Sequence, residues 1–434
     1  MKSATNCSVS TATIRELTTT EAFFLIGDGL YVGYGVTADG ALDLDALQRA
    51  AIRLSDAHPG LRARIVTDAP TGDAPASPTG AFVARESPTP VAVTRSVGPA
   101  DGTAPLPDVA LAQGSALAGV HVVTDPGGGH LVYLLVHHAL ADGHHALALL
   151  QSLWTAYTAI VTGTEEAPLA PTDFPKPLED LLTERGYSSA SDLPAEAPTV
   201  AGAVPAADGA FAAPADEATP ALRRIQLTRD ETAALIGYGH RAGRTVNQLV
   251  SAAFIAATAT TRDLGATRVV YGYPVDLRRR LGEPAAGFTE ITNALGMAFF
   301  QAGSDDAGLD DLAAQVGDAL ARDLAAGTVQ RPLAVGAAVQ PPEGSTVAVL
   351  TNWGPVPHLP TPPGLTLTDF HPALHVAAGS PSDTAAWDAL AATLTIGIVS
   401  SFQGRLSIDV SGSAVSDVLV TETLRNLRSF TLGE

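Results

Sequence analysis

The stretch of sequence that decides the fold is Leu131-Val132-Tyr133-Leu134-Leu135-Val136-His137-His138-Ala139-Leu140-Ala141-Asp142-Gly143. Its first six residues are apolar or aromatic, a run typical of a buried β-strand. Because consecutive residues of a strand point to opposite faces of the sheet, His137 and His138 are expected to differ in role. One of them would face the core and the other a cleft. Gly143 permits a backbone conformation that other residues resist.

Strand and helix signals alternate on both sides of this stretch. The glycine-rich segment 125–129 lies between two β-rich runs, 119–124 and 131–137, and predicts a hairpin. Further strands are predicted at residues 61–66, 81–85, 268–275, 346–351, 393–400 and 406–410. Helices are predicted from residue 44 to just before Pro59, from about 144, at 230–241, from about 245, at about 309–326 and at 417–428. The alternation predicts an α/β fold in two halves.

The length of 434 residues is too great for one hydrophobic core, so two domains are expected. Pro and Ala dominate residues 163–221 and periodicity is weak there, which is typical of a linker or a long crossover. The predicted organisation is an N-terminal domain at residues 1–175, a crossover at 176–221 and a C-terminal domain at 222–434.

Composition excludes several classes of protein. A formal charge of −20 argues against a nucleic-acid partner and weakens binding to an anionic membrane surface. Cys7 is the one cysteine, so internal disulfides and cysteine-based zinc clusters are excluded. The first residues lack the apolar core of a signal peptide, and no apolar stretch is long enough to span a bilayer. We therefore expect a cytoplasmic protein with no membrane span.

A histidine at the end of a strand can serve as a general base, because its unperturbed pKa lies near the working pH. It would deprotonate an alcohol or an amine, which then attacks a thioester carbonyl directly. The sequence contains no Gly-x-Ser-x-Gly motif, and Cys7 has no evident base beside it. A metal site at the clustered histidines is the competing interpretation. It is disfavoured because adjacent strand histidines rarely converge on one ion, and His144 and His145 are expected to open the next helix.

Asp142 raises a separate question, because a buried carboxylate needs a cationic partner. The dense basic run Arg278-Arg279-Arg280 can supply one. A solvated, charged loop is the alternative interpretation of this run.

The motif His137-His138-x-x-x-Asp142-Gly143 resembles the HHxxxDG signature of the condensation-domain superfamily. Free-standing length and the flanking histidines are most similar to polyketide-associated acyltransferases of actinobacteria, of the phthiocerol dimycocerosyl transferase type. Five weaker segments extend the resemblance over most of the chain: Leu17-Thr18-x-x-Glu21, His58-Pro59-Gly60-Leu61-Arg62-Ala63-Arg64, Thr245-Val246-Asn247-Gln248-Leu249, Asp276-Leu277-Arg278-Arg279-Arg280 and Thr351-Asn352-Trp353-Gly354. One departure is that Asp369-Phe370 is followed by His371-Pro372, unlike the Asp-Phe-Gly-Trp-Gly of the plant enzymes.

The resemblance implies a role for each residue of the motif. His138 would be the catalytic base and His137 a structural residue pointing away from it. Asp142 would be structural and paired with Arg278, while Gly143 would leave room for the acyl-donor arm. Later in the chain, Thr351, Asn352 or Trp353 would border the acceptor and donate to the developing oxyanion.

The same resemblance implies two chloramphenicol-acetyltransferase-like domains in a V, with a tunnel between them and His138 midway. The expected activity is transfer of an acyl group from coenzyme A or an acyl carrier protein to a hydroxyl of a polyketide-like or lipid acceptor. No metal and no cofactor beyond the thioester co-substrate are expected. A free-standing condensation enzyme that forms an amide, and a catalytically silent scaffold that binds a carrier protein, are the two alternatives.

Overall fold

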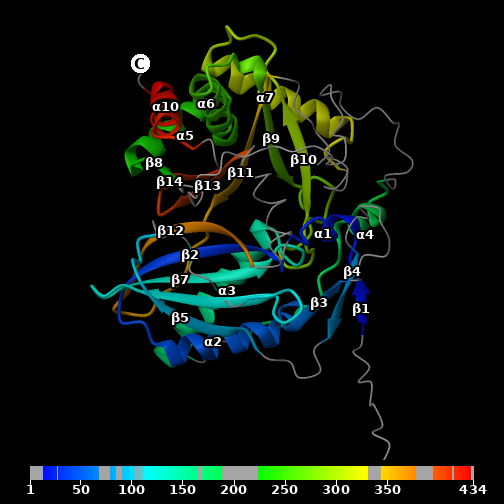
Figure 1. The fold of residues 1–434 in the computed structure, drawn as a ribbon, viewed down its shortest axis with the longest axis vertical. Helices are drawn as coiled ribbons and strands as arrows, with labels where there is room; N and C mark the ends of the chain where they lie inside the picture. The colour runs from blue at the N-terminus through cyan, green and yellow to red at the C-terminus, as the bar shows by residue number, and fades with distance from the viewer. Residues whose placement is uncertain are drawn as a thin grey trace, which may run out of the picture.

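The computed structural model describes residues 13–26, 28–67, 79–84, 90–102, 106, 109, 111–164, 169–187, 223–330, 344–377, 394–412 and 415–431. Figure 1 shows two halves, each built on a β-sheet with helices packed against it. The blue and cyan strands of the first half lie below the green, yellow and red elements of the second.

The first large sheet contains the strand that ends in the two histidines. Its order is β12-β2-β7-β6-β5. The bounds are β2 (Leu30–Gly40), β5 (Ala92–Val97), β6 (Ala118–Thr124), β7 (Gly129–His137) and β12 (Leu365–Val376). Strand β7 is central, with antiparallel β2 and β6 on either side, so Val132, Leu134 and Val136 are fully buried. Strand β12 comes from the second half of the chain and pairs antiparallel with the whole of β2.

The second large sheet has the order β10-β9-β11-β13-β14-β8. Its strands are β8 (Arg223–Gln226), β9 (Val269–Asp276), β10 (Leu295–Phe300), β11 (Thr346–Pro355), β13 (Leu394–Phe402) and β14 (Arg405–Ser411). Strand β11 runs parallel to both of its neighbours, β9 and β13, and the outer pairs are antiparallel. A small third sheet, with the order β1-β4-β3, contains β1 (Thr13–Glu16), β3 (Ala63–Thr67) and β4 (Gly80–Ala84).

Helices cover these sheets through apolar stripes. In the first half, α2 (Leu44–Ala57) begins at the N-cap Asp43, and it packs against α3 (Gly143–Thr162). The second half contains α5 (Arg229–Ala242), α6 (Val246–Thr261), α7 (Leu309–Ala325) and α10 (Asp417–Ser429). Each half has its own large core cluster, as expected for a chain too long for one core. Two short helices, α1 (Thr19–Ala22) and α4 (Leu178–Glu184), lie near the small sheet (Figure 1).

The predicted α/β class is confirmed, as are the hairpin of β6 and β7 and the helices predicted at both ends of the chain. Strands β1, β2, β5, β8, β10 and β12 were not predicted. Of the predicted crossover, residues 178–184 form α4, while residues 188–221 lie outside the described residues, as does Cys7. The domain boundaries stay a prediction, and β12 shows that one strand of the 222–434 range belongs to the sheet of the first half. Among the described helices, none combines the length and the apolarity that a bilayer crossing requires.

Candidate active site

The two histidines at the end of β7 point to different environments. His137 is fully buried, and its Nδ1 accepts a hydrogen bond from the Ala139 amide at 3.1 Å. Burial lowers the pKa of His137 to about 3, so the ring is neutral at physiological pH. It packs edge-on against Tyr31, on the side of the sheet away from the cavity. His138 is half-buried and lines the cavity described below.

Contacts to Asn293 fix the ring of His138. The Asn293 Nδ2 donates to the carbonyl oxygens of His138, at 2.6 Å, and of Ala139, at 3.2 Å. These bonds orient the amide so that its oxygen faces His138, and Oδ1 lies 3.2 Å from His138 Nδ1. Because an amide oxygen can only accept, the proton of the neutral imidazole is on Nδ1. Nε2 therefore keeps its lone pair.

Two further features hold His138 neutral and in place. Phe24 stacks on the imidazole with a centroid separation of 3.9 Å and an interplanar angle of 3°. Burial lowers the pKa of His138 below its usual value, against smaller raising effects from Asp142 and Asn293. A buried imidazole with its lone pair on Nε2 is suited to accept a proton near neutral pH.

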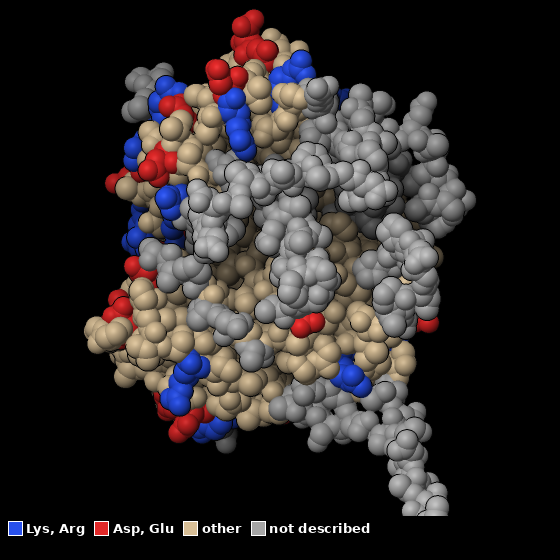
Figure 2. Space-filling view, viewed as in Figure 1, with Lys and Arg blue, Asp and Glu red and all other residues tan. Residues whose placement is uncertain are grey.

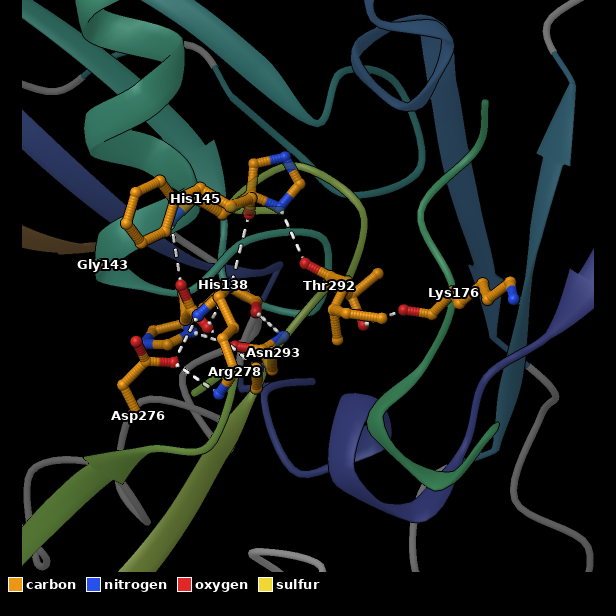
Figure 3. A network of polar contacts seen from close by, with 12 residues as sticks. His138, Gly143, His145, Lys176, Asp276, Arg278, Thr292 and Asn293 are labelled. Carbon is orange, nitrogen blue, oxygen red and sulfur yellow. Dashed lines mark hydrogen bonds and ion pairs between the residues drawn. The ribbon is translucent and has the colours of Figure 1, made fainter. Parts of the chain in front are cut away.

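Asp142 holds the turn after β7 through four partners, of which Arg278, His145 and Thr292 are labelled in Figure 3. Its carboxylate is fully buried and forms an ion pair with Arg278 at 2.9 Å. It also accepts from the amides of His145, at 2.9 Å, and of Ala294, at 2.8 Å, and the first of these contacts makes it the N-cap of α3. The Asp142 amide in turn donates to the Thr292 carbonyl at 3.0 Å. The pKa of Asp142 is lowered, because Arg278 and the two amides outweigh the effect of burial.

The segment 291–294 is the part of the site that sequence reasoning missed. It belongs to the second half of the chain, just before β10, and contacts the turn 138–145 along its length. Thr292 Oγ1 donates to Glu21 Oε1 at 2.7 Å, and Glu21 pairs with Arg15 at 2.6 Å. The buried Glu21 therefore links the short helix α1 to this segment. A polar Thr-Asn pair is common in loops, so nothing in the sequence distinguished Asn293.

Gly143 is the first residue of α3 and lies against Trp353 of β11. A Cβ atom on Gly143 would come within 2.7 Å of Trp353 Nε1, so the close approach of that indole requires glycine. Thr351 and Trp353 point to one face of β11 and Asn352 to the other, as alternation dictates. Asn352 is held by Asn247, at 3.2 Å, and by the Gly354 amide, at 2.8 Å. Thr351, Asn352 and Trp353 all line the cavity.

A cavity of about 2120 Å³ lies between the two halves and is lined by residues from both. Ligand sites for small molecules usually measure about 300–1,000 Å³, so this one has room for two substrates. Its walls are mainly apolar, with Phe24, Leu30 and Leu147 from the first half and Met297 and Ile398 from the second. In Figure 2, acidic and basic side chains lie along the left side, at the top and near the bottom of the view, and much of the remaining described surface is uncharged.

Cationic residues also reach the cavity wall. Arg279 and Arg280 are exposed and line the cavity. Asp276 also lines it, and its carboxylate forms an ion pair with Arg278 at 3.0 Å. The predicted basic run thus has two environments, with Arg278 buried in an ion pair and its two neighbours facing solvent.

The other two histidines of the motif region have separate surroundings. His145 Nδ1 donates to the Ile291 carbonyl at 3.0 Å, and burial lowers the pKa of His145 to about 4. A carbonyl oxygen can only accept, so Nδ1 carries the proton. His144 stacks on Phe288 at the cavity wall. Within the described residues, no group of three or more His, Cys, Asp or Glu side chains is placed to hold a metal ion.

A family model and two relatives that are similar in sequence to this chain carry the same protein name. The family model described as "Phthiocerol/phthiodiolone dimycocerosyl transferase C-terminus" matches residues 216–411. A phthiocerol/phthiodiolone dimycocerosyl transferase of Mycobacterium leprae is 30% identical, with 95% of this chain and 96% of the relative covered. The protein of the same name from Mycobacterium ulcerans is 31% identical, over 69% of this chain and 70% of the relative.

Solved structures show the same fold. Polyketide synthase associated protein 5 from Mycobacterium tuberculosis superposes with a TM-score of 0.72 at 24% identity, covering 97% of this chain and 98% of that chain. The first condensation domain of the CDA synthetase gives a TM-score of 0.60 at 17% identity, covering 97% and 96%. These likenesses confirm the predicted acyltransferase fold. The Mycobacterium leprae relative, 30% identical over nearly the full length of both chains, shows that this chain belongs to the phthiocerol/phthiodiolone dimycocerosyl transferase family and is an acyltransferase.

Proposed function

We propose that the protein transfers an acyl group from a thioester to a hydroxyl of a polyketide-like or lipid acceptor, with His138 as general base. The observation that carries the proposal is the position of His138 on the wall of a cavity shared by both halves, with Nδ1 directed to Asn293 and Nε2 left to accept a proton. The relatives are named for the transfer of a mycocerosyl group to phthiocerol or phthiodiolone, which supports a lipid acceptor.

The reaction follows from this arrangement in two steps. His138 Nε2 takes the proton of the acceptor hydroxyl as its oxygen attacks the thioester carbonyl carbon. The tetrahedral intermediate then collapses, the carbon–sulfur bond breaks, and the protonated His138 gives the proton to the leaving thiolate. No covalent enzyme intermediate and no cofactor beyond the thioester are needed, because proximity and orientation of two bound substrates supply much of the acceleration.

The developing oxyanion needs a donor close to His138. Thr351 and Trp353 share the face of β11 that borders the first half, since Trp353 belongs to that half's core. We assign the donor role to the Thr351 hydroxyl, because the Asn352 amide is already held by Asn247 and Gly354. A hydroxyl on this face would act as an oxyanion-hole donor.

The donor would carry a phosphopantetheine arm, which coenzyme A and acyl carrier proteins share. Arg279 and Arg280, exposed at the cavity wall, provide positive charge on a chain whose formal charge is −20. Such local charge is needed by either donor, since both are anionic. The two sources are separated by assaying an acyl-coenzyme A and the same acyl group on a carrier protein.

The test is acyl transfer by purified wild-type protein and by His138→Ala, with alcohol and amine acceptors and product detection by mass spectrometry. His130→Ala is the matched control, because that histidine lies on the β6–β7 hairpin away from the cavity. We expect the His138 variant to lose activity by at least about a hundredfold, as general-base contributions are about 10²–10⁴-fold, and the control to retain it. A folded His138→Ala protein with native turnover would refute the base. Amide products alone would indicate a condensation enzyme, and thioester binding without turnover a scaffold.

A further inference from the structure

The six-stranded sheet is open along part of its length, beside the site. Strands β9 and β11 are paired at four positions, from Val269↔Thr346 to Gly272↔Val349, and the pairing ends there. Beyond that point β9 still pairs with β10 as far as Asp276↔Leu295. The two strands therefore separate, and a gap opens between them toward their C-terminal ends.

The cavity passes through this gap. Tyr273, Pro274, Val275 and Asp276 follow one another along β9, and all four line the cavity. Neighbouring residues of a strand point to opposite faces, so residues of both faces contact one cavity only if that cavity passes the edge of the strand. The run 351–353 of β11, on the other side of the gap, lines the cavity in the same way.

Beyond the gap, a lobe of the cavity lies between the sheet and two helices, on the face of the sheet away from His138. Helix α6 and its N-cap contribute Thr245, Asn247 and Gln248, all at its first turn. Helix α7 contributes Val316, Gly317, Leu320, Ala321 and Leu324, residues at helical spacing on one side. Apart from Arg262, the C-cap of α6, none of the lining residues contributed by these two helices is charged. We call this part of the cavity the α6–α7 lobe (helices labelled in Figure 1).

We propose that the α6–α7 lobe binds the aliphatic chain of the acyl group, which enters it through the gap between β9 and β11. The proposal rests on the acyltransferase function proposed above. A thioester and an alcohol that meet at His138 have three arms: the thioester's carrier arm, the acceptor, and the acyl chain. The carrier arm and the acceptor must enter from solvent and leave again, whereas the acyl chain branches off at the reacting carbonyl. A largely uncharged side lobe that begins beside Thr351 and Trp353 fits that third arm.

Leu320→Trp is the variant that tests this proposal. Leu320 is half-buried and lines the lobe, so an indole there fills space that a chain would occupy. Asp318→Trp is the matched control, because Asp318 is an exposed residue of α7 outside the cavity lining. The measurement is kcat/KM for acetyl-, octanoyl- and palmitoyl-coenzyme A with one fixed alcohol, and for alcohols of increasing chain length with one fixed acyl-coenzyme A. We expect the palmitoyl-to-acetyl ratio to fall by about tenfold for every two methylenes excluded, and the control to keep the wild-type ratio.

A binding measurement separates failure of the site from failure of the proposed reaction. Parinaric acid, a fluorescent long-chain fatty acid, is titrated into His138→Ala protein with and without Leu320→Trp. Weaker binding in the double variant supports the lobe even if no thioester is turned over. Equal binding and an unchanged palmitoyl-to-acetyl ratio would overturn the proposal. It would also be overturned if only the chain-length preference for the alcohol changed, since the lobe would then hold the acceptor. If Leu320→Trp does not fold, Ala321→Leu, at an exposed position of the same lobe, replaces it.

Discussion

Replacing Asn293 by Ala tests whether this residue sets the protonation state of His138. The substitution removes three hydrogen bonds, two from Nδ2 to the carbonyls of His138 and Ala139 and one from His138 Nδ1 to Oδ1. Asn293 is fully buried, so water cannot replace these partners without entering the interface. At about 1 kcal/mol for each bond, the variant should lose about 2–3 kcal/mol of unfolding free energy.

The effect on catalysis has a magnitude and a sign. A freed imidazole samples other orientations and the other tautomer, and misplacement on the order of 1 Å costs about a hundredfold in rate. In the wild-type protein, the hydrogen bond to Asn293 raises the pKa of His138, against the larger lowering effect of burial. Its removal should therefore lower that pKa further. The acid limb of kcat/KM should move to lower pH in Asn293→Ala, while Asn293→Asp, which adds negative charge, should move it to higher pH.

The assay is kcat/KM measured from about pH 5 to 8, together with urea unfolding of each variant. Asn426→Ala is the control, because Asn426 is also buried and its Nδ2 donates to the Ala253 carbonyl at 3.2 Å, in the other core. That variant should lose stability without moving the acid limb. If the limb of Asn293→Ala stays in place or moves upward, Asn293 does not set the protonation of His138 and the tautomer assignment is wrong.

Two further predictions concern stability. Asp142→Asn breaks an ion pair in which both side chains are buried, and it should lower the free energy of unfolding by about 3–5 kcal/mol. Arg279→Ala, at an exposed position, should stay within about 0.5 kcal/mol of wild type. Equal losses in urea unfolding would contradict the structural role of Asp142 in holding the turn after β7. Burial raises the pKa of Asp409 to about 7, above the value of about 3.9 in the unfolded chain. The folded chain therefore holds a proton on Asp409 that the unfolded chain has lost, and this contribution to the free energy of unfolding disappears as the pH rises through 7. Asp409→Asn should therefore gain melting temperature relative to wild type between about pH 5 and 8, and a constant difference across that range would refute the assignment.

The sequence predicted the elements whose side chains are patterned and missed those that depend on distant partners. Strand β7 is a continuous apolar run, and this pattern predicts a strand that is buried inside its sheet. Strand β2 has glycines at 33 and 35, which weaken any strand signal. In the structure, a Cβ at Gly33 would come within 2.3 Å of Leu135, and one at Gly35 within 2.5 Å of Tyr133. The large side chains of β7 therefore fill the space above the glycines of β2. This packing can be recognised only once β2 is known to pair with β7.

Strand β12 was missed for a related reason. Pro372 lies in its middle, and proline cannot donate to a ladder, so the segment reads as irregular. It is tolerated because β12 is at the edge of its sheet and pairs with β2 alone. Recognising this requires knowing that a strand from residues 365–376 joins a sheet of residues 30–137. No local pattern contains that information.

The same limit explains which parts of the site could be predicted. His137, His138, Asp142 and Gly143 form one local motif, and their alternation on a strand end follows from backbone geometry. The basic run 278–280 was accessible by a charge argument, because a buried carboxylate needs a cation, and the family resemblance singled out Arg278 within it. Asn293 carries no charge and has no motif, and it lies 155 positions from the histidine that it contacts. Its role follows only from the contact between the two halves.

This distribution of contacts makes the docking of the two halves a condition for activity. The base comes from the first half, while Asn293, the amide of Ala294 and Arg278 come from the second. Each contact is buried and specific in direction, so a small separation of the halves would expose Asp142 and release His138 together. Loss of activity should therefore precede global unfolding under mild denaturation. Activity that persists until the helices melt would show instead that the first half alone can position its base.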